Sequence, residues 1–396
     1  MSNKVVICGV GMVPFRKPGE SISYELMAKG AAIAALKDAN IPYEKIQQSY
    51  CSYVYGDSCA GQAALYNVGI TGIPITNVNN NCASGSTAFA HAAQAIKYGI
   101  SECAMALGFE QMSPGAIEMV FPDRLSPIKR HTDAVADILN LPENERNLPP
   151  AVLMFGCQAE ILMNQYGISE NTLAKITVKS RQHAKHNPFA IYRSPLTVEQ
   201  VLEKPPIYRG LRKFFACPPS CGASAVIVCS EDFAKKNNLP IQVTLKGSGF
   251  CSDKAEFFES DALDVSFRGL SRLAAKQAYD EAGVSPCDID VIELHDCFTS
   301  NEIITYSALG LCDESDMEEF VLTGNNTYGG KVVIGPSGGL LAKGHPLGAT
   351  GLAQITEIVQ QLRGQSGVRQ VEGARLGLQH NGGLGSAGFV NIFEKH

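Results

Sequence analysis

The fold and the chemistry of this chain are decided by one short stretch, NNNCASGS at residues 79–86. Three consecutive Asn residues favour a turn, because their side chains bond to nearby backbone groups. The small residues that follow, from Thr87 to Ala95, predict a helix that packs close to another backbone. Cys82 would then lie at a helix start, where free N–H groups and the helix dipole favour a thiolate. A buried structural Cys is the alternative, but the polar turn favours an activated nucleophile.

The composition predicts a soluble, enzyme-sized protein. The chain has 396 residues, 45% of them hydrophobic, which is enough for two or three domains with real cores. Its net charge of −6 predicts no binding to nucleic acid. No apolar run approaches the roughly 20 residues that span a bilayer, so we expect no membrane insertion. The 13 Cys follow neither a metal-ligand nor a disulfide pattern. The Cys pattern predicts reduced thiols and no metal site. Because the chain also has no signal-peptide layout and no peroxisomal tripeptide at the end, we expect a cytoplasmic location.

The chain contains an internal repeat. Residues 39–46 and 282–289 each join a helix to a strand through a similar turn. In the same way CASGST at 82–87 aligns with HPLGAT at 345–350, and both open a helix, the second ending near Arg363. Chance similarity over six residues is the alternative. A true duplication would pack the two helices against each other and bring Cys82 and His345 to one central place.

The repeat predicts the domain organisation. Residues 1–115 would form an N-terminal α/β half, completed by about 214–238, and residues 239–396 would form a C-terminal half. Alternating strands and helices predict a mostly parallel, layered architecture. Residues 116–213 would form an inserted loop domain rich in Pro and basic residues. These charges suit an anionic, phosphate-bearing substrate, although a solvated surface explains most of them individually.

Further candidates for chemistry lie at strand ends and in Gly-rich loops. A buried strand ends in His295, Asp296 and Cys297, which is where α/β sheets place their sites. A core His beside a structural Cys is the alternative there. His345 follows a Gly-rich run, and residues 378–388 form another, whose N–H groups could make an oxyanion hole or simply a tight turn. Together with Cys82, these residues suit acyl transfer through a thioester intermediate.

At these residues the chain resembles the thiolase superfamily, and within it the sterol-carrier-protein-type thiolases. The resemblance covers the whole chain. Ordinary thiolases carry Asn-Glu-Ala-Phe where this chain has HDCF at 295–298, and Cys where it has His380. The resemblance rests on five motifs: NNNC at 79–82, HDCF at 295–298, NNTYGG at 325–330, KGHPLGATG at 343–351 and QHN at 379–381.

The resemblance implies a thiolase fold, with two duplicated α/β halves in five αβαβα layers plus a loop domain, usually as a homodimer. Cys82 would attack the thioester carbonyl of a 3-oxoacyl-CoA and keep the acyl group. His345 would activate Cys82 and donate to one oxyanion hole, with His295 helping through a bound water. Cys297 would take and return protons. The backbone of Cys82 and of the region at Gly382 and Gly383 would form a second oxyanion hole.

The remaining site residues are implied less directly. His380 would either touch the acyl group or only shape the pocket. Met154 and Phe155 would line an acyl pocket, although they also fit the core of a loop domain. Phe298 would contact substrate and Ser220 the pantetheine arm, while the insert would hold the CoA nucleotide. CoA would be a substrate, and no cofactor is expected.

The expected activity is that of an acetyl-CoA or propionyl-CoA C-acyltransferase, which cleaves 3-oxoacyl-CoA with CoA in fatty acid or sterol side-chain β-oxidation. One alternative is a condensing or C-acylating subunit that works with small partner proteins. Another is a silent acyl-CoA-binding subunit, although such a protein has no reason to keep Cys82, His295, Cys297 and His345 together. The sequence does not indicate the acyl chain. Because it ends at His396, we expect no fused lipid-carrier domain.

Overall fold

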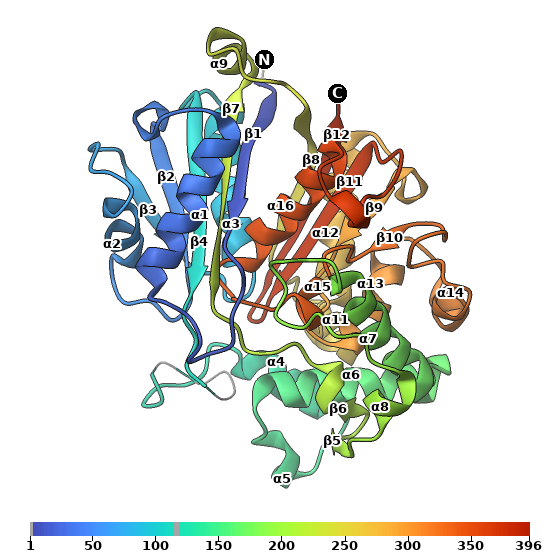
Figure 1. Cartoon of the computed structure of the whole chain (residues 1–396). Coiled ribbons are helices and arrows are strands. Elements are labelled where there is room, and N and C mark those ends of the chain that lie inside the picture. Colours follow the sequence, from blue (N-terminus) through green and yellow to red (C-terminus); the bar gives the residue numbers. More distant parts are fainter. Residues whose placement is uncertain (1–2, 115–118, 120) are drawn as a thin grey trace.

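The computed structural model describes residues 3–114, 119 and 121–396, and it shows two similar halves side by side (Figure 1). In the N-terminal half the strand order is β1-β7-β4-β2-β3, and in the C-terminal half it is β8-β12-β11-β9-β10. These orders are the same pattern repeated, and the two halves meet where Val6 of β1 pairs with Thr244 of β8. The strands are β1 (Val5–Met12), β2 (Gln48–Ser52), β3 (Ile75–Val78), β4 (Cys103–Glu110), β7 (Gly222–Ser230), β8 (Val243–Cys251), β9 (Val291–Glu293), β10 (Val333–Ile334), β11 (Leu376–Gly383) and β12 (Ala387–Lys395).

The prediction of a mostly parallel sheet is wrong, because each half is mixed. In the first half β4, β2 and β3 are parallel, whereas β7 runs antiparallel to both of its neighbours. The second half repeats this arrangement, with β12 antiparallel to β11 and β8. Strand β12 follows β11 across a short turn, and consecutive strands joined in this way must be antiparallel.

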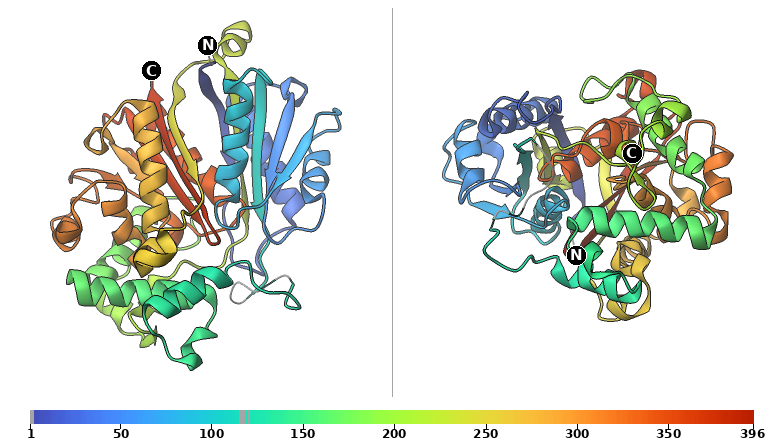
Figure 2. Two further views of the ribbon diagram at one scale, coloured as in Figure 1. Left: turned by 180° about the vertical axis from the view of Figure 1, so that it is seen from behind. Right: turned by 90° about the horizontal axis from the view of Figure 1, so that it is seen from below.

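The strands of both halves form one ten-stranded sheet, and helices form the layers outside and between its two halves, as the thiolase-type prediction expects. Helix α1 covers β1 and β7 on one outer face, and α12 covers β8 and β12 on the other. Helices α3 and α16 lie between the sheets and pack against each other (Figures 1 and 2). The helices of the two halves are α1 (Tyr24–Ala39), α2 (Ala60–Tyr66), α3 (Ser84–Lys97), α9 (Glu231–Lys236), α10 (Phe257–Ser260), α11 (Ala262–Val265), α12 (Arg268–Ala282), α13 (Thr299–Ala308), α14 (Met317–Leu322), α15 (Gly339–Ala342) and α16 (Thr350–Arg363).

The insert lies below the two halves in Figure 1 and shares a core with the second of them. Buried side chains of the insert, such as Leu153 and Leu173, belong to the same hydrophobic cluster as Ile303 of α13. The predicted domain boundaries stay predictions, and the one between residues 115 and 116 lies outside the described residues. Elements of the insert are α4 (Lys129–Ile138), α5 (Glu143–Arg146), α6 (Pro150–Tyr166), α7 (Glu170–Ala184), α8 (Val198–Leu202), β5 (Pro206–Tyr208) and β6 (Leu211–Arg212).

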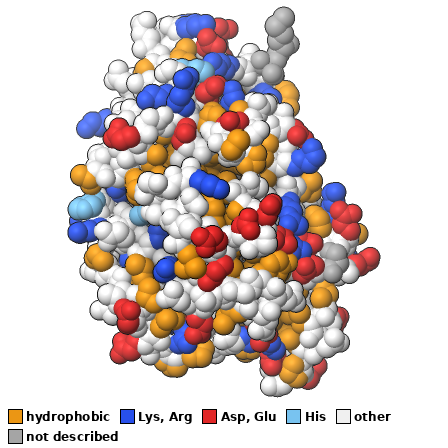
Figure 3. All heavy atoms as spheres, turned by 90° about the vertical axis from the view of Figure 1, so that its right-hand side faces the viewer, with side chains coloured by type: hydrophobic (Ala, Val, Ile, Leu, Met, Phe, Trp, Pro, Cys, Tyr) orange, Lys and Arg blue, Asp and Glu red, His pale blue; other side chains and the backbone are white. Residues whose placement is uncertain are grey.

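The surface seen in Figure 3 intersperses acidic and basic side chains, without a field of one sign on that face. Several basic residues of the insert are held in ion pairs, including Lys179 with Glu302 and Arg212 with Glu170. Within the described part of the chain, no helix is long and apolar enough to cross a membrane.

Small residues bring α3 and α16 into backbone contact, which confirms the prediction from the residues that follow Cys82. A Cβ placed on Gly85 would lie 3.0–3.1 Å from backbone atoms of Gly348, Gly351 and Leu352. A Cβ on Gly351 would lie 2.5 Å from the backbone N of Ser86 and 2.3 Å from its Oγ. Neither helix has room for a side chain at these positions.

Replacing Gly351 by Ala should therefore lower the free energy of unfolding by about 1–3 kcal/mol, because both helices are buried between the two halves of the sheet and cannot move apart freely. Chemical denaturation followed by circular dichroism measures this change. Gly30→Ala in α1 is the matched control, since its Cβ would meet the rotatable Cγ1 of Val13 at 2.9 Å rather than backbone. Unchanged stability of Gly351→Ala would contradict the close packing.

Candidate active site

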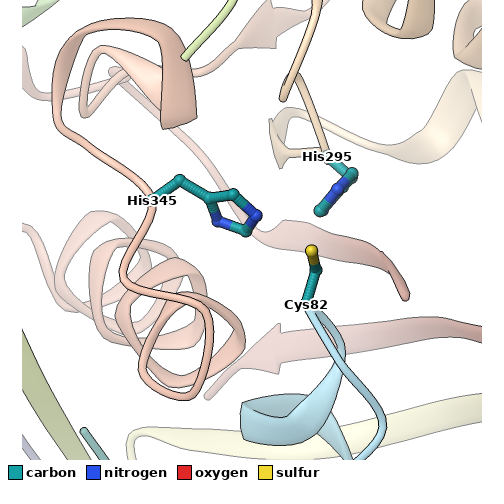
Figure 4. Close-up of side chains that lie close together, drawn as sticks. All are labelled: Cys82, His295 and His345. Atoms are coloured by element: carbon teal, nitrogen blue, oxygen red, sulfur yellow. The ribbon is translucent and has the colours of Figure 1, made fainter. Parts of the chain in front are cut away.

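Three reactive side chains from distant parts of the chain meet between the two halves (Figure 4). Cys82 lies in the turn before α3, His295 follows β9, and His345 lies between α15 and α16. The sulfur and one ring nitrogen from each His lie within 4.8 Å of one another, and all three residues are buried. The two imidazole rings are nearly perpendicular, at 81°, with centroids 5.2 Å apart. The structure therefore brings Cys82 and His345 together as the internal repeat predicts.

The turn that carries Cys82 is held by its own polar side chains. Ser84 Oγ donates to the carbonyl of Asn81 at 2.6 Å and accepts from the N–H of Asn80 at 2.9 Å. Asn79 Oδ1 accepts from the N–H of Asn81 at 3.0 Å, and Asn81 adopts a left-handed conformation with φ of 51°. These bonds explain why the triple Asn precedes the Cys, because Asn tolerates this backbone geometry and completes the turn.

Cys82 is a neutral thiol in this site. Burial raises its pKa to about 12, more than the backbone N–H groups of Leu384 and of Cys82 itself lower it. This differs from the expected thiolate, because the helix-start effect is smaller than the cost of desolvating a charge. A base must therefore remove the Cys82 proton during attack.

His345 is arranged to be that base. Its Nδ1 lies 2.7 Å from Oγ1 of Thr350, which donates its own proton to the carbonyl of Pro346 at 2.9 Å. Thr350 must therefore accept from His345, so the ring carries its proton on Nδ1. The lone pair on Nε2 remains, and this buried atom has no hydrogen-bond partner among the described residues. Burial also lowers the pKa of His345 to about 3, which keeps the ring neutral.

The two pKa values predict how acylation of Cys82 depends on pH. The His345 pKa of about 3 leaves the base unprotonated above about pH 4, and the Cys82 pKa of about 12 leaves the thiol protonated below about pH 11. The rate of acylation in rapid-quench mass spectrometry should therefore be nearly constant between about pH 5 and pH 9. A rise of tenfold or more through a pKa near 7 would indicate an ion pair instead.

Cys297 lies close enough to Cys82 for the two thiols to influence each other electrostatically. Burial raises the Cys297 pKa well above its ordinary value, so this residue is also a thiol. A third thiol, Cys217, was not among the predicted site residues. Its N–H donates to the carbonyl of Cys297 at 2.9 Å, and burial likewise raises its pKa. The Pro pair that follows Cys217, before a buried strand, is the sequence signal that could have marked it.

Asp296 holds two active-site loops together. Its carboxylate accepts from the backbone N–H of Leu340 at 2.8 Å and of Leu341 at 3.4 Å, at the start of α15. Gly339 makes room for this contact, since a Cβ there would lie 2.0 Å from the carboxylate. The bond fixes the loop of His295 and Cys297 against the loop that leads to His345.

Two predicted site residues, His380 and Ser220, accept hydrogen bonds from the backbone of His295 and His345. His380 accepts from the backbone N–H of His295 at 3.3 Å through Nδ1, and its Nε2 lies 2.9 Å from Ser271 Oγ. Both ring nitrogens are thus used within the protein, which favours the pocket-shaping role for His380. Ser220 is fully buried, accepts from the N–H of His345 at 2.9 Å and donates to Pro218. The geometry does not support its expected pantetheine contact.

An aromatic stack lies beside the reactive cluster. Phe155 stacks on Phe298 with centroids 4.2 Å apart and on Phe267 at 5.7 Å, and Phe267 lies 5.9 Å from the His295 ring. Met154 and Phe267 line a small cavity together with Gly383. A Cβ on Gly382 would strike Phe267, and one on Gly383 would strike the carbonyl of Asn80. Of the predicted substrate-binding residues, Met154 and Gly383 line this cavity, and Phe155, Phe298 and Gly382 contact or adjoin the aromatic stack beside it.

Comparisons with known proteins agree with this architecture. The thiolase N-terminal domain model matches residues 5–200, and the model described as thiolase C-terminal domain-like matches residues 257–395. Sterol carrier protein 2 of Oryctolagus cuniculus is 45% identical over 397 residues, which is 99% of this chain and 72% of that protein. An acetyl-CoA acetyltransferase of Methanothermobacter thermautotrophicus is 32% identical over 99% of both chains. Human mitochondrial 3-ketoacyl-CoA thiolase in complex with CoA superimposes with a TM-score of 0.73 at 21% identity, over 100% of this chain and 98% of that one.

The chain belongs to the thiolase family. Its similarity to sterol carrier protein 2 confirms the resemblance to the sterol-carrier type, and the solved thiolase structure confirms the fold. Family and relatives together support an acyltransferase of the acyl-CoA thiolase type.

Proposed function

We propose that the chain cleaves 3-oxoacyl-CoA with CoA and passes the acyl group through Cys82. The observation that carries this proposal is the unpartnered Nε2 of His345 in the same buried cluster as the Cys82 sulfur. A thiol, an unprotonated imidazole and a second His are the parts that covalent acyl transfer needs. A silent binding subunit would gain nothing from a buried lone pair, whose lack of a partner costs stability.

The first half-reaction assigns one proton transfer to each group. Cys82 attacks the 3-oxo carbon, because only attack there breaks the bond between C2 and C3; attack on the thioester carbonyl, as first expected, would not. His345 Nε2 takes the thiol proton. As the C2–C3 bond breaks, Cys297 gives its proton to C2, so that acetyl-CoA leaves and the remaining acyl group stays on Cys82.

The second half-reaction restores the site. The thiol of an incoming CoA gives its proton to Cys297 and attacks the acyl carbon, and Cys82 leaves and recovers its proton from His345. Cys82 thus recovers its own proton, and Cys297 receives the proton of CoA in place of the one that left with acetyl-CoA. The alternative, a C-acylating subunit with small partner proteins, would use the same groups. The homodimer and the cytoplasmic location stay predictions.

Mass spectrometry of the protein after incubation with acetoacetyl-CoA tests the proposal. An acetyl group should appear on Cys82 and should be removed when CoA is added. An unmodified Cys82 with short, branched and sterol-type thioesters alike would refute the activity for this chain.

A further inference from the structure

A chain of buried amide and hydroxyl groups leads from the protein core to His295. Its members are Gln354 on α16, Gln379 and Asn381 on β11, and Ser86 on α3, each 0% exposed. They come from both halves of the molecule and lie directly behind the reactive cluster. A fully buried network of this kind has fixed bond directions, because each group can donate and accept only in certain ways.

Gln354 fixes which groups of the network donate hydrogen bonds and which accept them. Its Nε2 donates to the backbone carbonyls of Leu294 at 2.8 Å and His380 at 3.1 Å. Carbonyl oxygens only accept hydrogen bonds, so the amide of Gln354 cannot be reversed. Its Oε1 must then accept, and the donor is Nε2 of Gln379 at 2.9 Å.

The direction is passed on to His295 without a break. The Nε2 group of Gln379 also donates to Ser86 Oγ at 2.9 Å. Ser86 has one proton to donate, and Oδ1 of Asn381 at 2.9 Å is the acceptor that the described residues offer it, so the Nδ2 group of Asn381 faces His295 Nδ1 at 2.9 Å. An amide nitrogen only donates, so Nδ1 of His295 must accept. A neutral His295 ring therefore carries its proton on Nε2.

The other side of Gln379 agrees with this direction. Its Oε1 accepts from Nδ2 of Asn391 at 2.7 Å, and Oδ1 of Asn391 accepts from Ser248 at 2.7 Å. The network also needs Gly351, since a Cβ there would lie 2.3 Å from Ser86 Oγ and 3.1 Å from Asn381 Oδ1. The hydrogen bond between Ser86 and Asn381 thus lies in the space that a side chain at position 351 would fill.

We propose that Asn381 is a positioning residue that fixes His295 as the tautomer with its proton on Nε2. Only Nε2 is then free for the site, where it offers an N–H to an oxyanion, whereas His345 offers a lone pair to Cys82. The same bond opposes metal capture: a Cys and two His are Zn²⁺ ligands, but an Nε2 that carries a proton cannot bind a metal. The contact of His295 Nε2–H with an oxyanion rests on the proposed function, whereas the assignment of the tautomer does not.

Asn381→Asp tests the inference with almost no change in shape. The carboxylate still accepts from Ser86, but it must now accept from His295 as well, which moves the ring proton to Nδ1. At alkaline pH, where the ring is neutral, kcat should fall by about 10²-fold with KM within twofold, as loss of an oxyanion donor predicts. The ring ¹⁵N shifts of His295 in ¹⁵N-histidine-labelled protein should show Nε2–H in the wild type and Nδ1–H in the variant. The signals are assigned by their loss in His295→Asn.

Inhibition by Zn²⁺ is a second measurement, and its concentration dependence should not change if Asn381 has only a structural role. In Asn381→Asp the lone pair on Nε2 completes a Cys-His-His set, so Zn²⁺ should inhibit at a concentration at least about tenfold lower than in the wild type. Asn326→Asp is the control for a buried carboxylate, since Asn326 bonds to Tyr306 away from this network. An Nδ1–H tautomer in the wild type, or an unchanged tautomer in Asn381→Asp, would overturn the inference. A wild type without thiolase activity but with the Nε2–H tautomer would refute only the proposed function.

Discussion

Turnover of 3-oxoacyl-CoA should fall by about 10⁶-fold in Cys82→Ala, because loss of the nucleophile removes the covalent route altogether. The remaining groups have no substitute for it: Cys82 is the thiol that forms the 4.8 Å cluster with His295 and His345. Spectrophotometric loss of the 3-oxoacyl-CoA measures turnover, and calorimetry with CoA shows whether the variant still binds its substrate. We expect binding to persist, since the substitution only shortens a buried side chain.

Cys217→Ala is the matched control for that prediction. Cys217 lies close enough to Cys82 for that thiol to raise its pKa and is joined to Cys297 through a backbone bond, but among the described residues the cluster with His345 contains Cys82 and not Cys217. The acyl adduct on Cys82 should therefore still form in Cys217→Ala. If Cys82→Ala kept even a hundredth of wild-type turnover, another residue would have to be the nucleophile.

The duplicated architecture could be predicted because its signals are local. Small residues after Cys82 and the match between residues 82–87 and 345–350 indicate two equivalent helices that touch, and α3 and α16 do so. The direction of the strands could not be predicted in this way. Strand β7 is reached only after the whole insert, and a buried apolar strand has the same pattern whether its neighbours are parallel or antiparallel.

The reactive residues could also be predicted from the sequence, but the residues that hold them in place by hydrogen bonds could not. Cys, His and Gly-rich turns have sequence signals, whereas Thr350, Gln354 and Ser86 are ordinary helix residues until the fold shows what they contact. The protonation states needed the structure as well. A helix start predicts a thiolate at Cys82, and only the packing of the loop at Leu384 and the surrounding core shows that burial dominates.

Cys297→Ala should remove one of the two proton transfers and reduce turnover by about 10³-fold or more, with acyl-Cys82 forming slowly. Attack by Cys82 needs only the lone pair of His345, which this substitution leaves in place. Release of acetyl-CoA and activation of the incoming CoA both need the Cys297 proton, so the variant should slow at these steps. The acyl adduct requires cleavage of the C2–C3 bond, so rapid-quench mass spectrometry with acetoacetyl-CoA should find it forming more slowly than in the wild type, and added CoA should also remove it slowly. His345→Ala should show little adduct at any time, because Cys82 then lacks the base that its attack needs. Normal turnover in Cys297→Ala would mean that another group, such as a water held by His295, supplies the proton.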